Sequence, residues 1–212
     1  MKGTTKQILT DMIARYPQMK NNENEVLAVY LILEKCFADG HRLYLCGNGG
    51  SASDCEHIAG ELLKSFKKAR PLSADLTEGL KMQGDRGQVL IENLQGGLPT
   101  VSLCGHTAFS TAFQNDCDPM FVFAQQVGAW GQEGDVLLTL STSGNSKNCI
   151  YAVTAAKAKK MSVVALLGGS GGELKTLADA SVIVPEKETY KVQELHLPVY
   201  HCLCAMLEEE FF

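Results

Sequence analysis

The sequence predicts an α/β fold, in which helices cover both faces of a parallel five-stranded sheet in a three-layer, doubly wound arrangement. Short apolar runs alternate along the chain with longer segments of helical periodicity. The runs are apolar at successive positions, as at 163–167, rather than at every second position. Because a strand covered on both faces has no solvated side, such runs indicate a buried parallel sheet. The alternation of strands with helices favours the doubly wound connection.

Two helices are expected before the first strand, over residues 5–16 and 23–38, because apolar residues recur there at helical spacing. Asn22 is the predicted N-cap of the second helix, and Glu25 follows it three residues later, as in a capping box. Gly40 is the predicted stop.

The remaining elements follow from the same signals. We expect strands at 42–46, 98–104, 135–140, 162–167 and 180–184. Helices are expected at 53–66, 88–94, 108–113, 119–127, 146–160 and 173–178, and a long final helix begins at about residue 189.

Length and composition favour one domain over residues 1–212, since 45% of the residues are hydrophobic and 20% are charged. The net charge of -5 argues against a nucleic-acid partner, because phosphate backbones are bound by basic surfaces. No apolar run approaches the length that crosses a bilayer, and the N-terminus carries no apolar signal segment. We therefore expect a cytoplasmic protein without a membrane partner.

The eight cysteines do not resemble a disulfide framework. Most lie inside apolar periodic segments and are predicted to be reduced core residues: Cys36, Cys46, Cys104, Cys149, Cys202 and Cys204. No CxxC spacing occurs, so we expect no cysteine metal site.

Two loops rich in Gly, Ser and Thr follow the strands at 42–46 and 135–140. A loop that leads from a strand into a helix exposes backbone N–H groups without helical partners, and the helix dipole adds positive charge there. Gly49 and Gly50 allow close approach of an anion. Hydroxyl donors come from Ser51, Ser141, Thr142, Ser143 and Ser146. Each loop alone is equally well explained as a tight turn, but both in one chain favour a phosphate site.

A nucleotide cofactor is not expected, because neither a P-loop lysine nor a GxGxxG motif is present.

His57 and Glu61 lie four residues apart on the helix that follows the first loop, so they share one helix face. Taken alone they are a surface pair, but their place after the glycine loop favours a functional role. On the final helix, Gln193 and His201 fall along one side, whereas His196 points away and is expected to be structural or at an interface. Pro198 is expected to bend that helix.

These motifs together resemble the sugar isomerase (SIS) domain family of the phosphoheptose isomerase type. The residues that carry the resemblance are segments 46–51, 57–62, 115–116, 141–146 and 192–196, followed by His201. The resemblance implies a flavodoxin-like SIS fold with two N-terminal helices and a long C-terminal helix. It also implies a homotetramer, held partly by residues 1–40 and the final helix, with a phosphorylated sugar as ligand. The activity it implies is phosphosugar aldose–ketose isomerisation, with sedoheptulose 7-phosphate as leading substrate and glycero-manno-heptose 7-phosphate as product.

The resemblance also implies roles for individual residues. Glu61 and His201 match the proton-transfer pair, which suits an enediol mechanism because that chemistry needs a carboxylate base and a second proton-shuttling group. Substrate contacts are implied for Asn48, Gly49, Gly50, Asn115, Asp116 and Gln193, and phosphate contacts for Ser51, Ser141, Thr142, Ser143 and Ser146. Zinc is an option in the family, with His57, Glu61, Gln193 and His201 at the ligand positions.

One segment departs from the family pattern, because residues 73–97 form an insertion where the family has a short link. Such a loop near an active site is often a lid or an interface element. Four basic residues before it are placed to steer a phosphate, or else form a solvated basic face: Lys64, Lys67, Lys68 and Arg70. This insertion could reshape the sugar pocket, so it affects the prediction of the heptose substrate more than the prediction of an isomerase.

Two alternatives use the same fold without catalysis. One is a scaffold like the SIS protein that binds the replication initiator DnaA, and the other is a sensor that binds a sugar phosphate without turnover. The presence of Glu61 and His201 argues against a pure scaffold, which has no chemical need for them.

Overall fold

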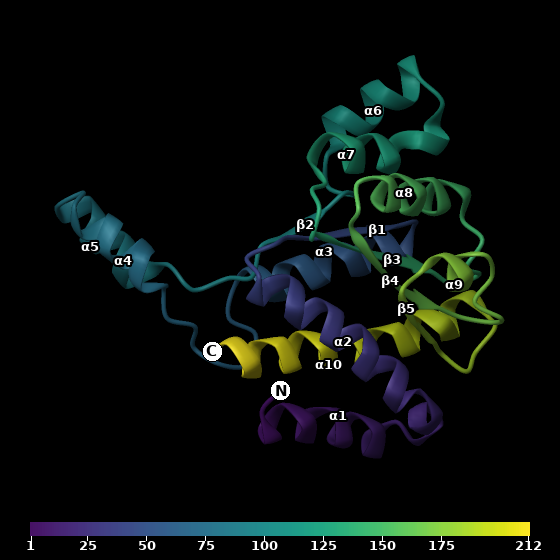
Figure 1. Ribbon diagram of the computed structural model, residues 1–212, viewed down its shortest axis with the longest axis horizontal. Coiled ribbons are helices and arrows are strands. Elements are labelled where there is room, and N and C mark those ends of the chain that lie inside the picture. Colours follow the sequence, from purple (N-terminus) through teal and green to yellow (C-terminus); the bar gives the residue numbers. More distant parts are fainter.

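The computed structural model describes all of residues 1–212 and contains one sheet of five parallel strands in the order β2-β1-β3-β4-β5. The strands are β1 (Leu43–Gly47), β2 (Thr100–Ser102), β3 (Val136–Ser141), β4 (Ser162–Leu167) and β5 (Ala180–Ile183). Every neighbouring pair is parallel. The predicted α/β class and strand number are confirmed (Figure 1).

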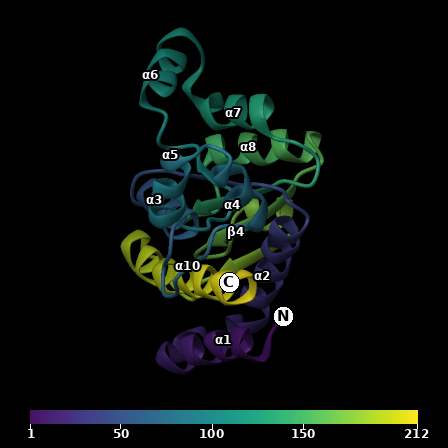
Figure 2. The same ribbon diagram turned by 90° about the vertical axis from the view of Figure 1, so that its left-hand side faces the viewer.

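Helices cover the sheet on both faces. Successive residues of β3 alternate between two apolar cores: Leu138 packs with α2 (Glu23–Ala38), α3 (Gly50–Leu63) and α10 (Thr189–Phe211), whereas Leu137 packs with α7 (Val122–Trp130) and α8 (Lys147–Ala158). The helix α1 (Gly3–Arg15) lies outside α10, on the side away from the sheet (Figure 2). No helix combines the length and the apolarity that a membrane crossing requires.

The N-terminal helices agree with the sequence prediction except at the cap. The 3-10 helix η1 (Pro17–Asn22) runs directly into α2, which ends before Gly40, a residue with φ of 78°. The predicted capping box does not form, because the Asn22 side chain makes no capping hydrogen bond. Instead its amide donates to Glu25 Oε2 at 2.7 Å, and the same carboxylate accepts the N–H of Ile183 at 3.0 Å. The pair therefore joins α2 to β5.

Most other predicted elements are present with shifted ends. The remaining helices are α4 (Ala74–Lys81), α5 (Asp85–Asn93), α6 (Thr107–Asp116), η2 (Pro119–Phe121) and α9 (Leu174–Leu177). The strand predicted at 98–104 is shorter, because Leu98 N donates to Leu62 O in α3 at 2.8 Å and Pro99 has no N–H to give.

All eight cysteines are free. Of the six predicted core cysteines, five are buried and Cys104 is half-buried; Cys55 is also buried and Cys117 is exposed.

The segment 73–97 contains two helices where the sequence indicated one. They form a hairpin that projects from the body of the molecule (Figure 1). Gly87 permits their close approach, since a Cβ there would lie 1.7 Å from the Leu80 carbonyl oxygen. Apart from Gly87 the two helices bury no residue, and Leu76 and Val89 are among their exposed apolar side chains. The two ends of the segment meet where Gly96 N donates to Arg70 O at 2.9 Å.

Replacing residues 74–94 with a Gly-Ser-Gly linker is expected to change the free energy of unfolding by less than about 1 kcal/mol, because the hairpin adds almost nothing to either core. The Tm should therefore stay within about 4 °C of the wild type in a calorimetric scan. The control is Leu138→Ala, which opens a core cavity and should cost about 2–5 kcal/mol. A linker variant as unstable as Leu138→Ala would contradict this description of the hairpin.

Candidate active site

The two glycine-rich loops lie side by side at the carboxyl edge of the sheet, because β1 and β3 are neighbouring parallel strands. A reciprocal amide pair joins them. Asn48 Nδ2 donates to Asn148 Oδ1 at 2.9 Å, and Asn148 Nδ2 donates back to Asn48 Oδ1 at 2.8 Å. Asn148 was not singled out from the sequence, where its place in the first turn of α8 was the only signal.

In the first loop the glycines serve two different needs. Gly49 has φ of 55°, a left-handed conformation that a side chain disfavours, and it directly precedes α3. Gly50 lies under the Gln193 side chain of α10, since a Cβ at Gly50 would meet Gln193 Nε2 at 2.6 Å. The structure therefore brings Gln193 to the glycine loop. Ser51 is buried in the first turn of α3.

In the second loop the hydroxyl groups shape the backbone. Ser141 Oγ accepts the N–H of Gly144 at 3.1 Å and lies 3.0 Å from Ser146 Oγ. Ser143 Oγ accepts the N–H of Asn145 at 3.2 Å, and Thr142 lies half-buried between them. Ser146 is the N-cap residue of α8 but makes no capping hydrogen bond. The first two N–H groups of this helix, those of Lys147 and Asn148, have no helical partner and are open to an anion, whereas the N–H of Cys149 donates to Asn148 Oδ1 at 3.0 Å.

Three predicted residues from two distant parts of the chain meet at the crossing of α3 and α10. His57 Nε2 lies 3.2 Å from Glu61 Oε1 and 3.5 Å from His201 Nε2. The ring of Phe66 lies against His201, with centroids 5.5 Å apart. The structure therefore places the predicted proton-transfer pair on either side of one imidazole.

Tyr200 and Asp54 support this cluster and were missed by the sequence analysis. The Tyr200 hydroxyl donates to Asp54 Oδ1 at 3.1 Å and lies 3.1 Å from His57 Nδ1. Because a carboxylate only accepts, the hydroxyl proton goes to Asp54 and His57 Nδ1 is the donor to the Tyr200 oxygen. In the neutral ring this leaves the Nε2 lone pair facing Glu61 and His201.

The electrostatics suit proton transfer. Burial lowers the pKa of His201, the neighbouring His57 lowers it further, and Glu61 opposes both. His201 is therefore neutral at pH 7 and able to accept a proton. Glu61 Oε2 is buried and accepts no hydrogen bond, although the Lys64 ammonium lies 3.5 Å away. This oxygen is therefore paired with Lys64 by charge alone, without a hydrogen bond.

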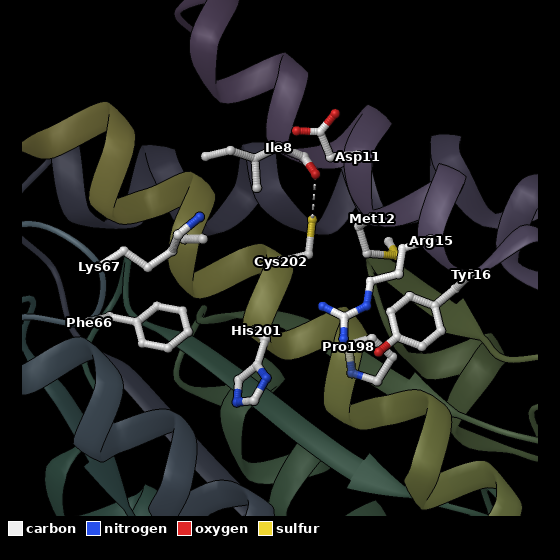
Figure 3. Close-up of a pocket in the computed structure, with 11 residues that line it drawn as sticks. Ile8, Asp11, Met12, Arg15, Tyr16, Phe66, Lys67, Pro198, His201 and Cys202 are labelled. Carbon is white, nitrogen blue, oxygen red and sulfur yellow. Dashed lines mark hydrogen bonds between the residues drawn. The ribbon is translucent and has the colours of Figure 1, made fainter.

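Two hollows open from the site residues. The first, of about 310 Å³, exposes His201 between α1, α10 and the segment after α3 (Figure 3). Its lining residues are Ile8, Asp11, Met12, Arg15, Tyr16, Phe66, Lys67, Pro198, His201, Cys202 and Ala205. The second, of about 360 Å³, is lined by the first glycine loop, Cys104, Asn148 and residues of α6, η2 and α7. Within one chain neither hollow contains both the glycine loop and His201.

Asn115 and Asp116 are not brought to the cluster. They lie exposed on α6, where Asn115 Nδ2 donates to Asp116 Oδ1 at 2.9 Å, and α6 stands out beyond α7 (Figure 1). Instead Ser110 and Gln114, one helical turn apart on α6, line the hollow of the first glycine loop. Their spacing along one helix face was the sequence signal that could have found them.

The four basic residues before the insertion do not form one surface. Lys64 lies beside Glu61, Lys68 pairs with Glu209, and Lys67 lines the His201 hollow. Arg70 is buried, so its prediction as part of a phosphate-steering or solvated basic face is wrong. Its charge is instead paired with Glu208.

The donor types near His57 fit zinc, but the arrangement is not a closed metal site. Zinc ligands about 2.0–2.1 Å from the metal at tetrahedral corners lie roughly 3.3 Å apart, close to the 3.2 Å and 3.5 Å contacts of His57. Nevertheless, no group of three or more His, Cys, Asp or Glu side chains is arranged to hold a metal ion.

The final helix is continuous through Pro198, from Thr189 to Phe211. Gln193 reaches the glycine loop and His201 reaches His57, so both sides of the proline contribute to the site. His196 is fully buried, with Nε2 3.2 Å from Leu167 O. Its prediction as a structural residue is confirmed.

Comparison with known proteins identifies the family. The SIS domain model matches residues 9–96 and again 90–168. This chain belongs to the SIS domain family. A phosphoheptose isomerase from Nitratiruptor sp. is 38% identical over 170 residues, which are 80% of this chain and 78% of that protein. One from Thiobacillus denitrificans is 40% identical over 180 residues, covering 84% and 79% of the two chains.

Solved structures agree with this assignment of the SIS fold. A phosphoheptose isomerase structure from Neisseria gonorrhoeae superposes with a TM-score of 0.74 at 30% identity and covers 94% of both chains. One from Francisella tularensis gives 0.74 at 28% identity, covering 99% of this chain and 100% of that one.

Stability of this SIS protein should fall in mild acid because of His196. Burial lowers its pKa from 6.5 to about 4, although the hydrogen bond with Leu167 O opposes the shift. Below pH 6.5 the unfolded chain binds a proton that the folded chain refuses until about pH 4. Each pH unit in that window therefore removes about 1.4 kcal/mol from the free energy of unfolding, and no more is lost below it.

The check is urea unfolding at pH 7 and pH 4.5 for the wild type and His196→Gln, whose amide can still donate to Leu167 O. The variant should lose about 2–3 kcal/mol less than the wild type between the two pH values. Equal losses in the two proteins would assign the acid sensitivity to other groups.

Proposed function

We propose that this SIS protein is a phosphosugar aldose–ketose isomerase that converts sedoheptulose 7-phosphate to glycero-manno-heptose 7-phosphate. The observation that carries the proposal is the contact of one His57 nitrogen with both Glu61 and His201. A carboxylate and a neutral imidazole are the groups that an enediol reaction needs, and α10 carries both His201 of this cluster and Gln193, which lies at the first glycine loop. The phosphoheptose isomerases among the relatives, 33–40% identical, support the heptose substrate.

The proposed reaction moves one proton between adjacent carbons. Glu61 removes the proton from the carbon next to the carbonyl, and the electron pair of that C–H bond forms the enediol double bond. His201 passes a proton between the two hydroxyl oxygens, which its lowered pKa allows at pH 7. Glu61 then returns its proton to the former carbonyl carbon, so the atoms balance without a redox partner.

The phosphate is proposed to bind at the second loop. The uncapped N-terminus of α8 offers backbone N–H groups, and the hydroxyls of Ser141, Ser143 and Ser146 surround it. Binding this end of the substrate orients the carbonyl end toward the first loop, which the Asn48–Asn148 pair holds next to it.

Assembly as a homotetramer is proposed to complete the site. In one chain the glycine loop and His201 open into separate hollows, so a neighbouring copy has to close them into one cavity. Exposed apolar side chains on α2, α3 and α10 supply surface for this contact: Leu31, Leu63, Tyr190 and Leu197.

A zinc ion is proposed as an optional cofactor held by His57, Glu61, Gln193 and His201. When bound, zinc would polarise the carbonyl and hydroxyl oxygens of the sugar. The contact of the Tyr200 hydroxyl with His57 Nδ1 would leave the Nε2 lone pair available to such an ion, the role that outer hydrogen bonds play for histidine ligands.

The substrate proposal is tested by an isomerisation assay across pentose, hexose and heptose ketose phosphates, with and without zinc. Turnover of the heptose phosphate above the others supports it. Turnover of a shorter sugar keeps the isomerase class but overturns the heptose assignment. Binding without turnover of any sugar would favour the non-catalytic alternatives.

Glu61→Gln should abolish incorporation of solvent deuterium at the carbon next to the carbonyl, because the amide cannot act as a base. The expected loss is about 10²- to 10⁴-fold, measured by mass spectrometry or proton NMR of the sugar. Glu56→Gln, an exposed residue on the same helix, is the matched control and should exchange at the wild-type rate. Exchange by Glu61→Gln at the wild-type rate would exclude Glu61 as the base.

Zinc binding predicts stoichiometric metal in the purified protein and a rise in Tm with added zinc, by mass action on the folded state. His57→Gln and His201→Gln should lower the zinc content by elemental analysis, whereas His106→Gln, which packs against Trp130 outside the cluster, should not. A wild-type protein that neither retains zinc nor gains Tm would rule the cofactor out.

A further inference from the structure

Arg70 and Glu208 form the ion pair of this chain whose two side chains are both buried, with exposed fractions of 0% and 1%. The Arg70 Nε donates to Glu208 Oε1 at 2.8 Å. Removing two charges from water is costly, and a buried ion pair is by itself weak evidence of a gain in stability. The other groups that the pair contacts therefore indicate its role.

Arg70 holds the end of α3. Its Nη2 donates to Glu61 O and its Nη1 to Leu62 O, both at 2.8 Å. These carbonyls lie in the last turn of the helix, where no later helical N–H reaches them, and α3 has no basic residue of its own there. The guanidinium supplies donors and a positive charge, which favours the negative end of the helix dipole. The backbone that carries the Glu61 side chain is thus fixed by Arg70.

Glu208 holds the segment that packs on His201. Its two oxygens accept the N–H groups of Phe66, Lys67 and Lys68 at 2.8, 2.8 and 3.1 Å. Burial raises the pKa of Glu208, but these N–H donors and Arg70 outweigh it and lower the pKa, so the group stays ionised. Glu208 also lies on α10, two helical turns after His201.

The pair therefore touches each of the three segments that build the site: the end of α3 with Glu61, the following segment with Phe66, and α10 with His201. We propose that Arg70 and Glu208 are positioning residues that hold Glu61 and His201 at the separation that proton transfer needs. They touch neither reacting atom. This inference rests on the proposed isomerase function.

The geometry makes arginine specific at this position. A lysine can keep the charge beside Glu208, but its single ammonium cannot match the planar fork that reaches two carbonyls and a carboxylate together. Without the two arginine bonds, Leu62 O keeps only the N–H of Leu98 and Glu61 O loses its side-chain donor, so the last turn of α3 is held less firmly. A displacement of about 1 Å at a reacting group can cost roughly 10²-fold in rate.

Arg70→Lys is the test variant. We expect kcat to fall about 10- to 100-fold while KM changes less than about twofold, because the substrate-binding loops are not touched. Both proteins are assayed at a temperature well below the Tm of the variant, so that each is fully folded. The matched control is Glu209→Gln, which breaks the partly exposed Lys68–Glu209 pair at the next residue of α10 and should leave kcat unchanged.

A second readout does not depend on turnover. The side-chain nitrogen resonances of His57 and His201 in ¹⁵N-histidine-labelled protein should shift in Arg70→Lys and stay in place in Glu209→Gln. Should Arg70→Lys not fold, Glu208→Gln is measured in the same way, since it keeps one accepting oxygen but removes the charge.

The outcomes separate the two proposals. Wild-type kcat and unchanged histidine resonances in folded Arg70→Lys would overturn the positioning role, as would a loss of rate that only tracks the unfolded fraction. An inactive wild-type protein would overturn the isomerase function, and the histidine resonances would still decide whether Arg70 positions the cluster.

Discussion

The site depends on the packing of α10 against α3. Ile58 and Leu62 of α3 and Val199 and Leu203 of α10 are buried in the same core, which fixes how the two helices cross. Polar residues that flank these apolar ones in the sequence are left at the edge of the contact, where His57 and His201 meet. Burial of apolar surface thus sets the distance between groups that are 144 positions apart.

The two glycine-rich loops of the site are positioned by the parallel sheet rather than by helix packing. Its strands are covered on both faces, so unpaired backbone N–H groups are available mainly where strands end and helices begin. Because β1 and β3 are adjacent, both glycine loops fall at one edge, and Gln193 of α10 reaches that edge through the space that Gly50 leaves. The helix α10 therefore carries one residue at the glycine loop, Gln193, and one in the histidine cluster, His201.

Much of this could be predicted from the sequence because the signals are local. The apolar run at 162–167 gave β4 its bounds, helical spacing gave α2 its bounds, and the i,i+4 spacing placed His57 beside Glu61. The approach of His201 followed only from the family resemblance, since no periodicity reveals which helices cross. The expected places of Asn115 and Asp116 at the substrate remain a prediction.

The wrong predictions share a cause. Each concerns a side chain whose role was predicted from its sequence neighbours but whose partner lies far away in the sequence. Glu25 bonds to β5 instead of capping its helix, and Arg70 is buried against Glu208 instead of facing solvent. The supporting bond from Tyr200 to Asp54 joins residues 146 positions apart and has no local signature.

The paired amides of Asn48 and Asn148 bear on how the two loops can move. Each side chain gives and receives one bond across the gap, so neither loop can swing without breaking both. The amide pair therefore couples the position of the loop after β1 to that of the loop after β3. Two loops that leave different strands thus present one joined surface at the carboxyl edge of the sheet.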